Sequence, residues 1–164
     1  MTENNQEDID REQDSIEVGG EIVADNNPEN DTYSVQISDE PTYGWMLEVL
    51  RNGKAWSSGF PFHQGQSFRM GVAKWKIVIA CLDIVRAFYE SGGIQPKEPI
   101  LKEALGDLNM SRISEFEVGR GARTIEQPVL RFVDNVREFQ FGVRKAGAIL
   151  RLHKEIEDFV VERG

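Results

Sequence analysis

Two segments of the chain align without a gap when one is shifted by 71 residues. Residues 66–93 and 137–164 share six identities over 28 positions, where roughly one or two are expected from background composition. The shared residues are Phe68, Gly71, Val72, Lys74, Phe88 and Gly93 in the first copy and Phe139, Gly142, Val143, Lys145, Phe159 and Gly164 in the second. Each copy begins with the alternation of a strand and continues with the period of a helix. We therefore expect two similar halves, each stable only when the other covers its apolar sheet face.

The first half, residues 32–93, is predicted to contain four strands followed by one helix. Alternating apolar side chains predict strands over residues 32–38, 45–50, 54–58 and 66–72. Asn52 and Gly53 lie between the second and third of these, and this dipeptide favours a hairpin because both residues tolerate positive φ. From Lys74 the apolar period changes to 3.6, which predicts one amphipathic helix that ends at Gly92 and Gly93.

The second half, residues 111–164, shows the same order. Its strands are predicted over residues 112–118, 123–126, 129–133 and 137–143, with a turn at residues 119–121 and a final helix. Between the halves, Pro99 suits a first helical position, and apolar residues follow it at helical spacing, so residues 94–110 are predicted to hold a short connecting helix. The fold class is α+β: two ββββα repeats with antiparallel sheets, each packed by its helix, in one pseudo-twofold domain.

The net charge of −9 belongs to the N-terminal segment. Residues 1–31 hold 11 Asp and Glu against Arg11 alone, while the remaining residues hold 17 acids and 18 bases. With few apolar side chains, this acidic tail is predicted to be disordered. It is either a solubilising leader or a polyanion that competes for a basic surface of the body or recruits a protein partner.

The residues for catalysis or metal binding are sparse. One cysteine, Cys81, falls in an apolar helical run, and the two histidines, His63 and His153, form no spacing suited to zinc. The acids of the last helix, Glu155, Glu157 and Asp158, suit a solvated face. We expect no enzyme, no cofactor and no metal. No run of 18 apolar residues is present, so we expect a soluble protein without membrane contact in a reduced intracellular compartment, cytoplasmic or nucleoid-associated.

Basic and aromatic residues interleave on the predicted strands. A helix covers one face of each sheet, and the other could stack bases and pair with phosphates. The candidate nucleic-acid-binding residues are Arg51, Lys54, Trp56, Arg69, Arg120, Arg123 and Arg131. Two observations oppose this interpretation. Any single aromatic residue, Trp56 included, is better explained as core, although this does not explain the set of Arg and Lys residues, and Glu115 and Glu117 would repel a polyanion.

The two strands of the form Phe-x-apolar-Gly-Val, residues 68–72 and 139–143, each run directly into an amphipathic helix. In this arrangement the chain resembles the PUR repeat family, whose fold is shared with Whirly proteins. The resemblance implies two intertwined repeats that bind single-stranded DNA or RNA on curved sheets, with Lys54, Trp56, Arg69, Arg123 and Arg131 implicated. Because the Phe-x-apolar-Gly-Val segment is shared by both copies, we interpret it as structural and expect Phe68 and Phe139 to face the helices.

The predicted function is a non-enzymatic single-stranded DNA- or RNA-binding protein with a modulating acidic tail. Homodimerisation is a further expectation. The alternative is a protein-interaction or assembly module of the same fold that uses its sheet edges or helices and binds no nucleic acid.

Overall fold

The computed structural model describes residues 30–56, 68–103, 115–121 and 127–164. The protein is α+β, with two four-stranded sheets and four helices in these ranges. Contacts divide the chain into two compact units. Unit 1 comprises Met1–Ser38 and Glu48–Arg69, and unit 2 comprises Asp39–Leu47 and Met70–Gly164. The acidic segment before residue 30 lies outside the described residues.

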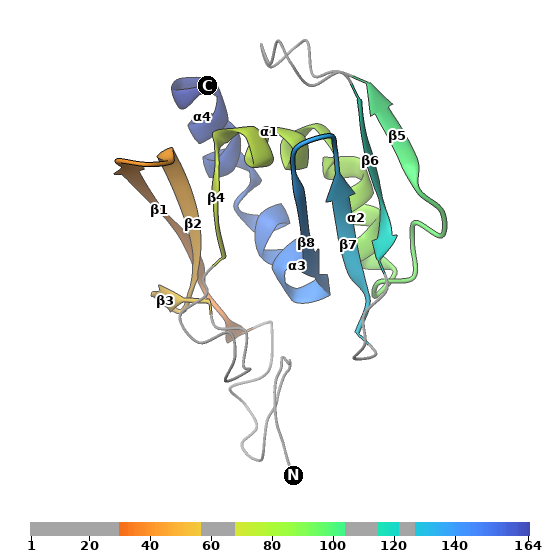
Figure 1. The fold of residues 1–164 in the computed structure, drawn as a ribbon. Coiled ribbons are helices and arrows are strands. Elements are labelled where there is room, and N and C mark those ends of the chain that lie inside the picture. The colour runs from red at the N-terminus through yellow and green to blue at the C-terminus, as the bar shows by residue number, and fades with distance from the viewer. Residues whose placement is uncertain (1–29, 57–67, 104–114, 122–126) are drawn as a thin grey trace. The chain divides into compact units, whose positions relative to one another are not determined.

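The first sheet contains β1 (Tyr33–Glu40), β2 (Gly44–Arg51), β3 (Lys54–Ala55) and β4 (Phe68–Gly71). Its order is β1-β2-β3, with β4 also paired to β2 (Figure 1). The hairpin predicted at Asn52 and Gly53 is confirmed: both residues have positive φ, 55° and 77°, and Arg51 pairs with Lys54 across the turn. The four strands predicted in this half all overlap a strand of the structure.

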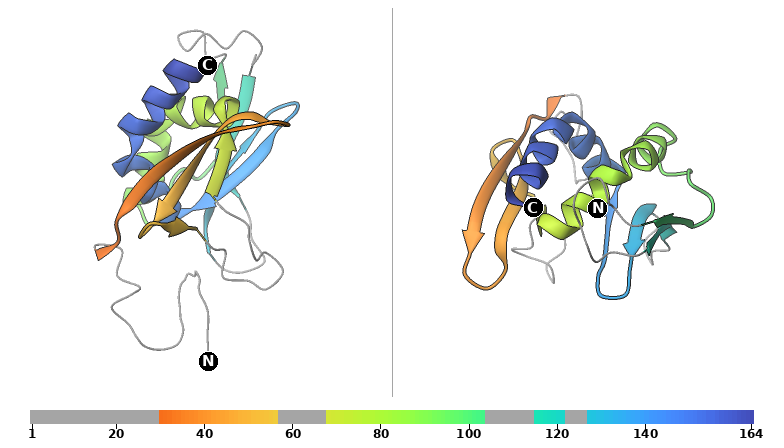
Figure 2. Two further views of the ribbon diagram at one scale, coloured as in Figure 1. Left: turned by 90° about the vertical axis from the view of Figure 1, so that its left-hand side faces the viewer. Right: turned by 90° about the horizontal axis from the view of Figure 1, so that it is seen from above.

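The second sheet is an antiparallel meander in unit 2. Its strands β5 (Ile100–Glu103), β6 (Glu115–Gly121), β7 (Val129–Val133) and β8 (Glu138–Gly142) lie in the order β5-β6-β7-β8. One face is buried beneath the helices, as Figures 1 and 2 show. The buried side chains of that face are Phe116, Val118, Leu130, Phe132 and Phe141.

Two predictions for the residues of this sheet are wrong. Residues 100–103, expected in a connecting helix, form strand β5, which pairs with β6 from Ile100↔Val118 to Glu103↔Glu115. Residues 119–121, expected as a turn, continue β6 and pair with β7. Glycine at position 119 allows this part of β6 to pass close to Pro99. A Cβ atom there would lie only 2.8 Å from the Pro99 Cα. The predicted strand over residues 123–126 lies outside the described residues.

Each predicted helix is two helices. The first is divided into α1 (Val72–Ala80) and α2 (Leu82–Glu90), and the second into α3 (Val143–Arg151) and α4 (His153–Arg163). The breaks fall at Cys81 and Leu152, 71 residues apart, where ψ moves to 23° and 12°. At each break the backbone N–H donates to the carbonyl three residues earlier, Val78 or Ile149. This tightened turn redirects the chain without proline or glycine.

Helices α1 and α3 are buried on all sides at their centres. Residues 75–78 and 146–149 are four consecutive buried positions in each helix, and successive helical residues point about 100° apart, so no single face accounts for them. Helix α1 contacts α4, and α2 contacts α3. In the second contact, the Tyr89 ring lies where a methyl group on Gly147 would be, 2.6 Å from Cε1. The core of unit 2 therefore depends on helices far apart in sequence.

Candidate nucleic-acid interface

Trp56 is part of the core of unit 1. Trp56 directly follows β3 in the chain and is 7% exposed. The Tyr33 ring stacks on it at 5.6 Å between centroids and 9° between planes, and the Phe68 ring meets it edge-on at 6.1 Å. The sequence left open whether Trp56 is a binding or a core residue, and its burial favours the core. Phe68, at 5% exposed, is also buried.

Arg51 binds within its own unit. Its Nε donates to Asp31 Oδ2 at 2.9 Å, and its guanidinium carbon lies 5.6 Å from the centroid of Trp56. Asn52 Nδ2 also donates to Asp31, whose side chain is buried, and Asn52 Oδ1 accepts from the Thr32 N–H. This network ties the start of β1 to the β2–β3 turn, and it assigns Arg51 a structural role.

Lys54 and Arg69 are the exposed cations of unit 1 among the predicted residues. The register places Lys54 opposite Arg51. Because side chains alternate along a strand, these two share the face of β2 that carries the buried Leu47 and Val49. On β4, Phe68 and Met70 are buried on one face, and Arg69, which lies between them, projects from the other face. The structure therefore does not bring Lys54 and Arg69 onto one sheet face.

In the second sheet, Arg131 is paired with an acid. Its Nε donates to Glu138 Oε2 at 2.8 Å across the β7–β8 hairpin. The hydrogen bond to Glu138 raises the pKa of Arg131, and the same bond lowers the pKa of Glu138. Arg120 reaches from the end of β6 to the Ile94 carbonyl, 3.5 Å from Nη1. Arg123 lies outside the described residues.

The outer face of the second sheet is acidic. Alternation and register place four carboxylates on it, and among its described strand residues Arg131 is the one cation. The acids are Glu103, Glu115, Glu117 and Glu138. Glu103 stands directly opposite Glu115, an arrangement in which like charges repel. This face is therefore unsuited to a polyanion, in line with the objection that Glu115 and Glu117 raised at the sequence level.

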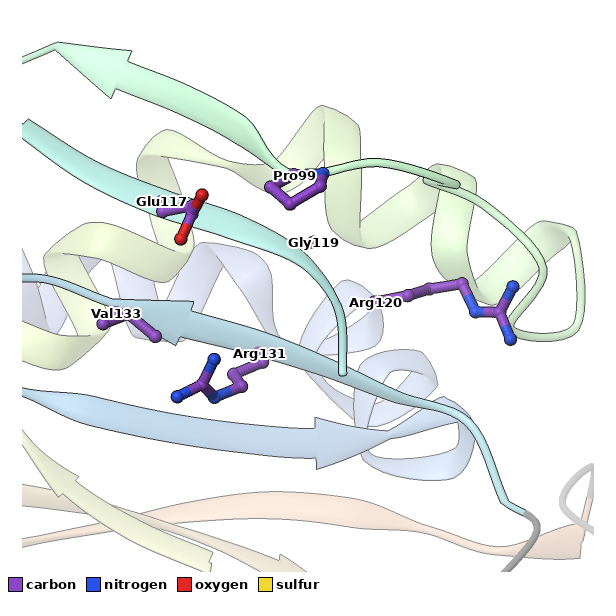
Figure 3. A pocket seen from close by; sticks show the side chains of 6 residues that line it. All are labelled: Pro99, Glu117, Gly119, Arg120, Arg131 and Val133. Carbon is purple, nitrogen blue, oxygen red and sulfur yellow. The ribbon is translucent and has the colours of Figure 1, made fainter. Parts of the chain in front are cut away.

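A small hollow lies on this outer face, and Figure 3 shows its walls. It is lined by Pro99, Glu117, Gly119, Arg120, Arg131 and Val133, and its cavity volume is about 40 Å³. Pockets for small molecules are typically roughly 300–1,000 Å³. The hollow can take water or the tip of one side chain, and it is too small for a nucleotide.

Two ring-and-cation contacts in unit 2 were not predicted as sites. Lys74 Nζ lies 5.7 Å from the centroid of the half-buried Phe139, and the Arg163 guanidinium carbon lies 4.0 Å from that of Trp45. Tyr43, in the β1–β2 turn, is 76% exposed. The sequence repeat could have drawn attention to Lys74, because the aligned residue in the second copy, Lys145, is also a lysine. Tyr43 and Arg163 had none.

Metal and thiol chemistry find no support in the described residues. They contain no group of three or more His, Cys, Asp or Glu placed to hold a metal ion. Burial raises the pKa of Cys81 to about 12, so its thiol is not a nucleophile near neutral pH. The Nδ1 of His153 lies 2.9 Å from the Leu150 carbonyl, to which it donates across the break between α3 and α4.

Comparisons with protein-family models, curated proteins and solved structures gave no match. Within the described ranges, every helix is too short or too polar to traverse a lipid bilayer.

Proposed function

We propose that the chain consists of two structural repeats and binds single-stranded DNA or RNA without catalysing a reaction, as the resemblance to PUR and Whirly proteins implies. The observation that carries this proposal is the spacing of structural elements. α1 and α3 begin 71 residues apart, both helical segments break at equivalent positions, and the runs of four buried residues are equivalent as well. Identity in six positions alone would not require the same break in both copies.

The proposed contacts differ from those suggested by the sequence pattern. Trp56 is buried, and Arg51 and Arg131 each form an ion pair with an acid. We assign phosphate contacts to Lys54 and Arg69 because both side chains are exposed. A nucleobase needs an accessible ring face. In unit 2 we assign this role to Tyr43, whose side chain is 76% exposed, independently of the cations of unit 1. Stacking of a base on such a ring contributes about 1–3 kcal/mol. The acidic segment before residue 30 competes with nucleic acid for these cations.

A titration of the full chain with labelled single-stranded DNA, single-stranded RNA and duplex DNA tests the proposal. We expect single strands to bind more tightly than duplex, with log affinity falling linearly as log salt rises. A full-length variant with Gln or Asn in place of the acids of residues 3–17 should bind more tightly. If that variant binds no single strand at about 50 mM salt, where phosphate contacts are strong, the proposal is wrong.

Point variants locate the interface. Lys54→Gln, Arg69→Gln and Tyr43→Ala should each weaken binding about threefold to tenfold, whereas Arg131→Gln should leave it unchanged because Arg131 pairs with Glu138 on an acidic face. A loss of affinity for Arg131→Gln equal to that for Lys54→Gln would contradict the assignment.

A further inference from the structure

Strand β5 is an edge of the second sheet. It pairs with β6 on one side, and no described strand pairs with its other side (Figure 1). The backbone groups along such an edge can pair with a further extended chain. Leu101 is 70% exposed and Ile100 is 37% exposed. The edge thus offers apolar side chains together with backbone hydrogen-bonding groups.

Carboxylates surround Leu101 on the outer face. Glu117 stands opposite Leu101, and Glu103 stands opposite Glu115. Among the described strand residues of this face the one cation is Arg131, which forms an ion pair with Glu138 at 2.8 Å. The inner face of the edge differs, since Lys102 lies 3.8 Å from Asp83 of α2. An added strand would therefore meet negative charge on the outer face.

We infer that the β5 edge docks an extended basic segment of a partner protein as an additional strand. Apolar side chains of the segment would contact Leu101, and its Lys or Arg side chains would lie beside Glu103, Glu115 and Glu117. None of its residues belongs to the set proposed to contact nucleic acid.

Charge selects this occupant over two others. A second copy of the chain, paired through β5, would join two acidic outer faces into one continuous surface. The N-terminal segment of the same chain carries 11 acids and one arginine in residues 1–31, so it would add repulsion as well. A basic segment neutralises the opposed pair Glu103 and Glu115.

The test uses the full chain and a blocked synthetic peptide in which Lys and Val alternate over seven residues. Two further peptides serve as controls: one has Glu in place of each Lys, and one has N-methyl groups on alternate valines, which removes hydrogen-bond donors and keeps the charge. Measured by isothermal titration calorimetry, the first peptide should bind at least tenfold more tightly than either control. If the N-methylated peptide binds equally well, charge alone accounts for binding and strand addition is wrong.

Variants of the protein locate the surface. Leu101→Ser and the double variant Glu103→Lys/Glu115→Lys should each reduce affinity for the basic peptide about tenfold. The matched controls on α4, Val161→Ser at a side chain 66% exposed and Glu155→Lys/Glu157→Lys, should not change it. Leu101→Thr, which keeps strand propensity, replaces Leu101→Ser if that variant melts early. Equal losses in test and control variants, or no binding of the basic peptide, would overturn the inference.

Discussion

The contacts of α1 with α4 and of α2 with α3 join helices that correspond in the sequence alignment at an offset of 71 residues, but they use different side chains. In α3, Gly147 leaves room for the ring of Tyr89. The residue 71 positions before Gly147 is Lys76 in α1, whose side chain is 5% exposed and lies against Gly164 at the end of α4. The residue 71 positions after Tyr89 is Val160. The contact of α2 with α3 thus places the Tyr89 ring against a glycine, whereas α1 places the long side chain of Lys76 against the end of α4.

The largest effect is expected at Gly93, the equivalent of Gly164. Gly93 has φ of 95°, and a methyl group there would collide with the Pro128 ring, 2.7 Å from Cβ. Gly93→Ala should lower the free energy of unfolding by about 3 kcal/mol, since it combines backbone strain with overpacking. Urea denaturation measures the loss.

Gly92→Ala is the matched control for Gly93→Ala. Gly92 also has positive φ, 68°, but nothing lies within 4 Å of a methyl group there. Gly92→Ala should lower the free energy of unfolding only through backbone strain, by about 1–2 kcal/mol. Equal losses for the two variants would show that contact with Pro128 does not matter.

The next effect is expected at the contact of α2 with α3. Gly147→Leu should destabilise the protein by about 2 kcal/mol, because Tyr89 must leave its place. Gly147→Ala should lower the free energy of unfolding by less, because alanine stabilises a helix by about 1 kcal/mol relative to glycine. Thermal melts of both variants test the order.

Adding Tyr89→Ala to Gly147→Leu tests the coupling. The double variant should recover part of the stability lost by Gly147→Leu, because the leucine takes the space of the ring. If the two changes are additive, the contact between them is not the cause of the loss.

Lys76→Met should have a smaller effect of the opposite sign. Burial lowers the pKa of Lys76 from 10.5, so the charged form opposes folding. Replacement by methionine should stabilise the protein by up to about 1 kcal/mol near pH 7. The lowered pKa means that the penalty is present at pH values below the native pKa and is relieved as pH rises toward 10.5. The advantage of Lys76→Met should therefore shrink in melts at increasing pH, and a constant advantage would contradict this cause.

The smallest effect is expected in the chemical labelling of Cys81, which lies at the break between α1 and α2. Cys81 is fully buried and its equivalent, Leu152, is 5% exposed. With the pKa of Cys81 raised to about 12 by burial, a thiolate-selective reagent at pH 8 should not label the folded protein. Labelling should become complete in denaturant. Rapid labelling of the folded chain would show that the α1–α2 break opens readily.

Local signals predicted some of these elements and not others. The hairpin at Asn52 and Gly53 depends on two adjacent residues, so the sequence was sufficient. The break at Cys81 has no local cause, because no glycine or proline is present and the apolar stripe continues across it. Residues 100–103 fit a helix and a strand equally well by spacing, and only pairing with β6 decides between them.

The candidate site shows the same limit. The sequence gives the positions of the basic residues but not their partners. Arg51 binds Asp31, 20 residues earlier, and Arg131 binds Glu138 across a hairpin. Whether an arginine is available to a ligand depends on these pairings, which follow from strand register. The acidic character of the outer face could be anticipated from Glu115 and Glu117, whereas the contribution of Glu103 could not, since its strand was predicted as a helix.

The pairing of α1 with α4 also bears on how the chain is made. During synthesis, α1 leaves the ribosome long before residues 153–163, which supply its helical partner. Until then the apolar surface of α1 that meets α4 has no native cover, and the first half of the nascent chain cannot complete its core. The packing of α4 on α1 is therefore a late step in completing the core of unit 2, and α1 lacks this cover until residues 153–163 have been synthesised.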